Sequence, residues 1–177
     1  MNGIFITAEL EGALGARIHE LQTRWDPKLA RELPPHVTLI GSSGAGPIAP
    51  DMAVAELRQA ILPVVRATEP LNLAFGTPYR FIGREIVVLP LSPHGPLRTL
   101  HEALKQSGIR HDAARWPFTP HCTLNFYVTL TPESLRALLT VREAEPWQLH
   151  SLRVYHSRDG VPPKLLFDAP LGAGAGV

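Results

Sequence analysis

The residues best suited to chemistry occur in two copies of one short motif. Residues 35–39 read Pro-His-Val-Thr-Leu, and residues 120–124 read Pro-His-Cys-Thr-Leu. The copies lie almost half of the 177-residue chain apart. A His-x-Thr triplet alone is expected by chance, but a proline before it and a leucine after it in both copies is not. The repeat therefore indicates two half-sites that supply the same pair of side chains.

The polar side chains of the repeat could act together on a phosphodiester without a metal ion. A neutral imidazole can take a proton from the attacking oxygen while an imidazolium gives a proton to the leaving oxygen. Unperturbed imidazole titrates near pH ~6.5, so two histidines can share one proton close to neutrality. Threonine hydroxyls can donate to the non-bridging oxygens, where charge gathers in the transition state. The candidate catalytic residues are therefore His36, Thr38, His121 and Thr123.

Each copy of the motif must form a strand if these side chains are to meet. The proline before each histidine blocks continuation of a helix, and a short apolar run with β-branched residues follows. Residues two apart on a strand share a face, so His36 points with Thr38 and His121 points with Thr123. Cys122 then turns to the packed side, which argues against a role as a nucleophile.

The two motifs, their separation and the chain length resemble the two-histidine (2H) phosphoesterases, which include 2′-5′ RNA ligase-like proteins and RNA 2′,3′-cyclic phosphodiesterases. The resemblance covers essentially the whole chain. It implies an α+β, bilobal fold in which two pseudo-symmetric antiparallel sheets, flanked by helices, surround a central cleft. It also implies that residues 1–177 form a single domain of two intertwined lobes, with one motif on an inner strand of each.

The resemblance leaves the substrate open. Our leading hypothesis is a phosphodiesterase that opens a 2′,3′-cyclic phosphate at the end of an RNA or oligonucleotide. In the RNA-end members an arginine often follows the second motif, whereas here Asn125 and Phe126 follow it. We therefore keep two alternative functions beside the leading hypothesis. One is a cyclic phosphodiesterase for a small nucleotide metabolite, such as a cyclic phosphate of ADP-ribose, and the other is a non-catalytic RNA-binding module.

The composition restricts the class of protein further. A net charge of +1 gives no strong electrostatic argument for nucleic acid. One cysteine excludes an intrachain disulfide framework, and no stretch resembles a signal peptide or a membrane-spanning helix. We expect a cytoplasmic monomer without a membrane partner, a cofactor or a metal. A metal site would need four dispersed residues to converge, namely His36, His121, His111 and Asp112.

The rest of the pattern predicts alternating strands and helices. Residues 3–8 predict a first strand, and the apolar spacing over residues 14–25 predicts an amphipathic helix. We expect Asp51 to cap a later helix that Pro63 kinks or ends early. A change in the phase of alternation predicts a β-bulge near residues 150–151.

Candidate substrate-binding residues follow from these elements. Alternation in the first strand turns Phe5 away from the isoleucines on either side of it. The segment before the second motif, residues 110–119, carries an arginine and two aromatic residues that could hold a phosphate and stack on a base. Alternation beyond the second motif adds two more residues to its cleft face. The predicted substrate-binding set is Phe5, Arg115, Trp116, Phe118, Asn125 and Tyr127.

Overall fold

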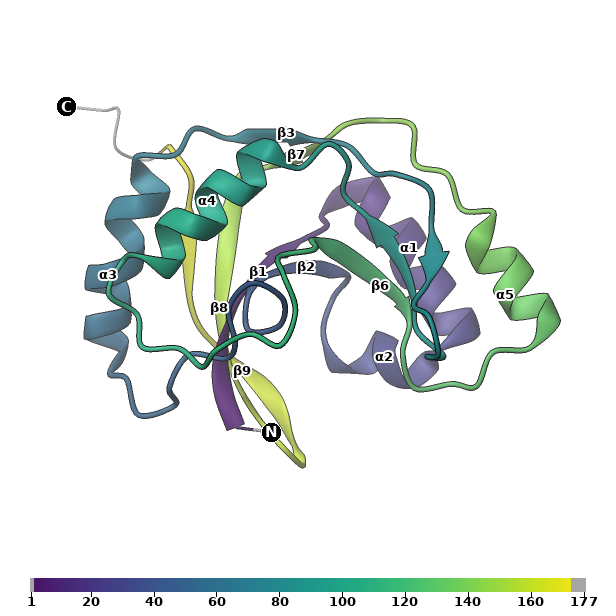
Figure 1. Ribbon diagram of the computed structural model, residues 1–177, viewed down its shortest axis with the longest axis horizontal. Helices are drawn as coiled ribbons and strands as arrows, with labels where there is room; N and C mark the ends of the chain where they lie inside the picture. Colours follow the sequence, from purple (N-terminus) through teal and green to yellow (C-terminus); the bar gives the residue numbers. More distant parts are fainter. Residues whose placement is uncertain (1, 173–177) are drawn as a thin grey trace.

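The computed structural model describes residues 2–172 and shows strands and helices mixed along the whole chain (Figure 1). The strands are β1 (Asn2–Glu9), β2 (His36–Ile40), β3 (Leu71–Leu73), β4 (Tyr79–Arg80), β5 (Val87–Pro90), β6 (His121–Asn125), β7 (Trp147–Leu149), β8 (Ser151–Arg158) and β9 (Val161–Pro170). The helices are α1 (Gly12–Trp25), α2 (Pro27–Glu32), α3 (Val54–Arg66), α4 (Gly95–Lys105) and α5 (Pro132–Leu139). Seven strands form one sheet in the order β4-β5-β6-β2-β1-β8-β9, and β3 pairs with β7 in a small second sheet.

The two motif strands are neighbours in the middle of the large sheet. β2 pairs with β1, and β6 pairs with β5, both antiparallel. Between β2 and β6 only one residue pair forms, Val37 with Cys122. The α+β fold class is therefore confirmed, and the two sheets expected from the sequence are joined into one at this single pair.

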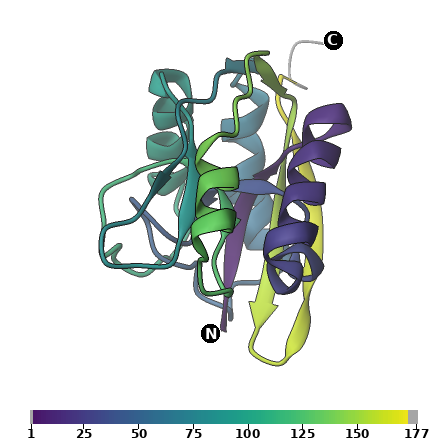
Figure 2. The same cartoon turned by 90° about the vertical axis from the view of Figure 1, so that its right-hand side faces the viewer.

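Helices flank each half of the sheet (Figure 1). α3 and α4 pack against β9 and β2, whereas α1 and α5 pack against β6 and β5. Figure 2, which looks at the right-hand flank of Figure 1, shows α1 and α5 in front and α3 behind. None of the helices within residues 2–172 is long and apolar enough to cross a membrane. The apolar side chains of both motif strands lie fully buried in one continuous core, namely Val37, Leu39, Cys122 and Leu124.

α1 follows the amphipathic pattern expected from the sequence, but the chain then turns directly into a second helix. The Oδ1 atom of Asp26 accepts a hydrogen bond from the backbone N–H of Leu29 at 3.1 Å and so caps α2. Pro27 ends α1 because it cannot continue that helix, yet proline is also favoured at the first position of a helix. The sequence pattern predicts the end of α1 and does not predict α2.

Asp51 does not cap the third helix as expected, and the helix does not end at Pro63, whereas a kink at Pro63 stays a prediction. α3 begins at Val54, and Asp51 does not cap it but binds Arg110, with 3.0 Å between Oδ1 and Nη2. Pro63 lies inside α3, which continues to Arg66. A proline this close to the end of a helix removes one of its hydrogen bonds and leaves the earlier turns intact.

The expected bulge near residues 150–151 is also wrong. β7 pairs with β3 in the small sheet, whereas β8 pairs with β1 and β9 in the large one. The change in the phase of alternation marks the point where the chain leaves one sheet for the other. A strand that changes sheets and a bulged strand leave the same trace in the hydrophobic pattern.

Candidate active site

The pairing of β2 with β6 brings the four motif side chains together. The antiparallel register between the two strands places His36 beside Thr123 and Thr38 beside His121. Residues directly opposite each other on neighbouring strands have their Cβ atoms only about 4.5–5.5 Å apart. All four side chains are half-buried, on the face opposite to the buried apolar residues of the same strands. The sheet thus presents two imidazoles and two hydroxyls as one group, which is the arrangement that the strand alternation predicts.

Both imidazoles are held in the same way. Nδ1 of His36 lies 2.7 Å from the carbonyl oxygen of Pro34, and Nδ1 of His121 lies 2.7 Å from that of Thr119. A carbonyl oxygen only accepts, so each Nδ1 carries the hydrogen and donates. Nε2 is then the nitrogen left for proton transfer in both rings. The carbonyl two residues upstream therefore fixes the tautomer and the orientation of each ring.

The surroundings lower the pKa of both histidines. For His36 burial is the largest cause, the bond to the Pro34 carbonyl opposes it, and the positive charge of His121 lowers the pKa further. Burial also lowers the pKa of His121, against the opposing effect of the Thr119 carbonyl. Repulsion between two charged rings favours a pair that holds a single proton. One neutral ring and one charged ring are the forms that acid–base catalysis needs.

A cavity of about 210 Å³ lies beside these side chains, and three of them, His36, Thr38 and Thr123, line it. His121 lies opposite Thr38 in the strand register but is not among the residues that line the cavity. Its ring meets the ring of Phe81 edge-on, with ring centroids 5.4 Å apart and an interplanar angle of 83°. Aromatic rings form much of the cavity wall, namely Phe5, Phe126, Tyr127 and Tyr155. The cavity thus joins acid–base groups to flat apolar surfaces of the kind on which a base can stack.

Two predicted substrate-binding residues, Phe5 and Tyr127, line this cavity. Phe5 packs against Gly41, where a Cβ atom would come within 2.2 Å of the ring and the φ angle is +126°. The hydroxyl of Tyr127 donates to Oε2 of Glu32 at 2.6 Å, and Nζ of Lys28 lies 3.9 Å from its ring centroid. Both rings are held in place at the cavity wall. Stacking of a base on either ring stays a prediction.

The segment before the second motif contributes less than its composition suggests. Phe118 is buried and stacks on His101, with centroids 3.9 Å apart and planes 9° apart, so its ring belongs to the core. The expectation that Phe118 stacks on a base is therefore corrected. Arg115 and Trp116 are exposed and do not line the cavity. A role for these two residues in binding a longer ligand stays a prediction.

Asn125 does not line the cavity either. Its side chain is buried, and Nδ2 donates to the backbone carbonyls of Glu85 and Val128 at 2.6 and 2.8 Å. The register between β5 and β6 shifts between Val87 and Val88, opposite the end of the motif strand. Simple alternation therefore fails one residue after the motif, and the amide shapes the following turn instead of meeting a ligand.

Two other chemistries raised by the sequence do not fit the geometry. Cys122 is fully buried on the opposite face, and burial raises the pKa of its thiol to about 12. The thiolate needed for nucleophilic attack is therefore disfavoured. Within residues 2–172, no group of three or more His, Cys, Asp and Glu side chains could hold a metal ion. His111 does not converge on the motif histidines but bonds the backbone carbonyl of Asp112 through Nδ1 at 2.8 Å.

A polar network behind the cavity fixes Tyr155, which sequence reasoning does not identify. Its hydroxyl donates to Oε1 of Glu9 at 2.6 Å, and Arg153 pairs with the other carboxylate oxygen of Glu9. Arg153 also contacts two more exposed carboxylates. Because Glu9 lies opposite His36 in the β1–β2 register, this network supports the sheet next to the first motif.

Asp26 is a second residue that sequence reasoning does not identify. It is fully buried, and its Oδ2 atom accepts hydrogen bonds from the backbone N–H groups of Phe126 and Tyr127, both at 2.7 Å. Its other oxygen caps α2. One carboxylate thus ties the loop after the second motif, which lines the cavity, to the junction between α1 and α2.

We expect Asp26→Ala to lower the free energy of unfolding by about 3 kcal/mol, since it leaves three backbone donors without their acceptor and removes a helix cap. Urea denaturation of the two proteins measures the difference. Asp51→Ala is the matched control, because its exposed ion pair should contribute only about 0–1 kcal/mol. Equal losses in the two variants would contradict the role assigned to Asp26.

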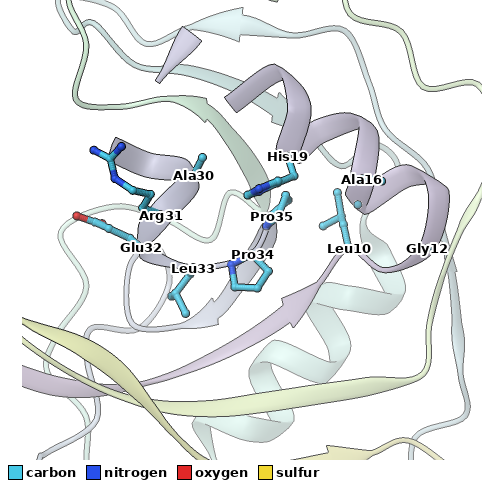
Figure 3. A pocket seen from close by; sticks show the side chains of 11 residues that line it. Leu10, Gly12, Ala16, His19, Ala30, Arg31, Glu32, Leu33, Pro34 and Pro35 are labelled. Carbon is cyan, nitrogen blue, oxygen red and sulfur yellow. The ribbon is translucent and has the colours of Figure 1, made fainter. Parts of the chain in front are cut away.

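A larger, open groove of about 370 Å³ lies on the far side of residues 32–35. Figure 3 shows it between α1, which carries Ala16 and His19, and the segment that carries Leu33 and Pro34. It contains none of the four polar motif side chains, and Pro35 is the one motif residue among those that line it. We therefore place the candidate active site in the smaller cavity, where the polar motif residues meet.

The fold and the paired motifs define a two-histidine phosphoesterase. Residues 10–161 match the model of the 2'-5' RNA ligase superfamily, and the chain belongs to this family.

Solved structures share the fold at low sequence identity. The crystal structure of TT0787 of Thermus thermophilus aligns at a TM-score of 0.68, with 19% identity over 97% of this chain and 98% of that one. E. coli LigT complexed with 3'-AMP aligns at 0.58, with 19% identity over 96% and 98%. A structure described as a phosphoesterase aligns at 0.58, with 18% identity over 96% and 98%. No curated protein matches this chain.

Proposed function

We propose that the protein hydrolyses a 2′,3′-cyclic phosphate at the end of an RNA or oligonucleotide, with the two motif histidines as acid and base. The observation that carries the proposal is the shared tautomer of His36 and His121, whose Nδ1 atoms both donate to a backbone carbonyl. Each ring thereby keeps Nε2 for proton transfer. E. coli LigT, a relative in fold, has been solved with 3'-AMP and with ATP, so nucleotides are the ligands recorded for that protein.

The proposed reaction needs no group beyond the two motifs and water. The water oxygen forms a bond to phosphorus while the neutral histidine takes a proton from it. The bond from phosphorus to one ribose oxygen breaks, and the charged histidine gives that oxygen a proton. The product is a phosphate monoester beside a free ribose hydroxyl, and the two histidines exchange their protonation states through solvent before the next turnover. Thr38 and Thr123 donate to the non-bridging oxygens as their charge increases.

A product assay tests this proposal directly. An oligonucleotide that ends in a 2′,3′-cyclic phosphate, a cyclic mononucleotide and an ADP-ribose cyclic phosphate are each incubated with the protein in EDTA. We expect the oligonucleotide to give a monoester. Turnover of the metabolite alone would favour the alternative substrate, and binding of RNA without turnover would favour a non-catalytic module. Activity that disappears in EDTA and returns with a divalent metal would contradict the metal-free scheme.

The pH dependence of kcat/KM should be bell-shaped, with its maximum below pH ~6.5, the ordinary pKa of imidazole. The base works only when neutral, so the rate rises with pH through the pKa of that histidine. The acid works only when charged, so the rate falls as pH rises through the pKa of the other. Both pKa values are lowered, and both limbs therefore move to the acid side. A maximum above pH ~7.5 would contradict this reading of the site.

A further inference from the structure

The two motif strands separate immediately after their single pair, and a side chain from α1 occupies the point of separation. Beyond Val37 and Cys122, β2 and β6 are no longer paired. The carbonyl oxygen of Thr123 instead accepts a hydrogen bond from Nε2 of Gln22 at 2.8 Å. A side chain from another element thus takes the place of a strand partner at the second motif.

Gln22 is unusual for the inward side of a helix. Its side chain is only 3% exposed, and it lines the cavity together with His36 and Thr123. The Thr123 carbonyl can only accept, so the amide nitrogen must face it and the orientation of the amide is fixed. The other amide atom, Oε1, is buried without a hydrogen-bond partner. A buried polar atom in this state destabilises a protein by about 1–3 kcal/mol, which an apolar side chain would avoid.

α1 and the residue that follows it hold the second motif at two places. Ile18 and Gln22 lie one turn apart in α1, Asp26 follows the last residue of the helix, and all three are buried. Gln22 binds the backbone inside β6, and Asp26 binds the two residues that follow it. Gln22 and Asp26 therefore hold β6 and the residues after it where the sheet itself provides no pairing with β2.

We propose that Gln22 is a positioning residue that sets the separation of the two motif strands and so aligns His36 and His121 on one phosphorus atom. This inference rests on the proposed function for its catalytic consequence. Acid and base must both lie within hydrogen-bond range of the reacting oxygens. A displacement of about 1 Å in such a site can reduce the rate by roughly 10²-fold. The polar amide in the core is retained because it fixes this geometry.

Gln22→Met tests the proposal, because methionine has a similar length and fills the space without a hydrogen-bond donor. We expect kcat to fall by about 10–100-fold while KM stays within about threefold, since an alignment lost in the transition state lowers kcat. Thermal unfolding should be nearly unchanged, because the change removes the unpaired amide oxygen while it leaves the Thr123 carbonyl without its donor, and the two effects on stability oppose each other. Gln106→Met, the same change at an exposed position at the end of α4, is the matched control and should behave as the wild type.

A second readout does not depend on turnover. NMR titration of the imidazole C2–H signals measures the pKa of His36, which burial and the charge of His121 lower. If Gln22→Met lets the strands move apart, the pKa of His36 should rise toward its ordinary value. Glu9, which faces His36 from β1, stays paired with Arg153 and Tyr155 and should not contribute to the change.

The outcomes separate this inference from the proposed function. A folded Gln22→Met protein with wild-type kcat and an unchanged pKa of His36 would overturn the positioning role. A shifted pKa of His36 in a protein whose wild type turns over no cyclic phosphate would support the positioning role and refute the proposed function. Should Gln22→Met fail to fold, Gln22→Leu carries the same two measurements, because it also removes the donor and introduces no charge beside His36.

Discussion

Replacing either motif histidine by alanine should lower kcat by about 10²–10⁴-fold, the usual contribution of one general acid or base. His36 and His121 each present Nε2 from a ring whose Nδ1 is already bonded to a backbone carbonyl. The threonine hydroxyls beside them cannot replace either imidazole, since a hydroxyl titrates far above neutral pH. The kcat of the double variant should be scarcely lower than that of either single variant. The acid and the base act in one step, so the losses of kcat in the two single variants do not add.

Two controls make the histidine result specific. His150→Ala removes an exposed imidazole at the junction of β7 and β8 and should leave kcat unchanged. Cys122→Ala alters the opposite face of the second motif strand and should keep kcat within a few-fold of the wild type. If the Cys122 variant were folded and as inactive as the histidine variants, the assignment of the strand faces would be wrong.

The single histidine variants would also assign acid and base, which the near-symmetry of the two motifs leaves open. A variant without the general base should lose the rise of the rate at low pH. A variant without the general acid should lose the fall of the rate at higher pH. The charge of His121 lowers the pKa of His36, so removing His121 should also move the titration of His36 upward. This shift can be followed by NMR in the His121→Ala protein without any substrate.

The motif strands could be predicted because their signal is local. A proline, a two-residue alternation and an apolar partner at each step place His36 and Thr38 on one face without any knowledge of the rest of the chain. The same rule fails at Asn125, one residue beyond the second motif, where the register shift in the neighbouring strand changes the face. The alternation of side chains along a strand predicts which face a residue occupies only while the pairing with the neighbouring strand stays regular.

The residues that complete the site depend on contacts between distant elements. Gln22, in α1, binds Thr123 of β6 across 101 residues of sequence, and Asp26, just after α1, binds Phe126 just after β6 across 100 residues. A signal was nevertheless present in the sequence. Both residues are polar, and each directly follows an apolar residue of the amphipathic pattern, Leu21 or Trp25, so each lies next to the predicted inward face. A polar residue next to the apolar side of a helix therefore deserves a search for the backbone group that it binds.

Replacing a motif threonine by valine should lower kcat by about 10–10³-fold, since each hydroxyl is one donor to the charge that develops on the non-bridging oxygens. Valine keeps the branched shape and the strand preference, so the fold should survive the change. Thr38 and Thr123 lie on different strands, and each stands beside the histidine of the other motif.

The size and the type of this defect distinguish transition-state donors from residues that only bind the ground state. A donor that acts in the transition state should lower kcat and kcat/KM together, whereas loss of ground-state binding should raise KM and leave kcat unchanged. Thr129→Val, at an exposed position after β6, is the matched control and should match the wild type. Because the hydroxyls do not titrate near neutral pH, both threonine variants should keep the full bell-shaped profile at a reduced height. A threonine variant that loses one limb of the bell would mean that the hydroxyl acts by changing the pKa of the histidine opposite it.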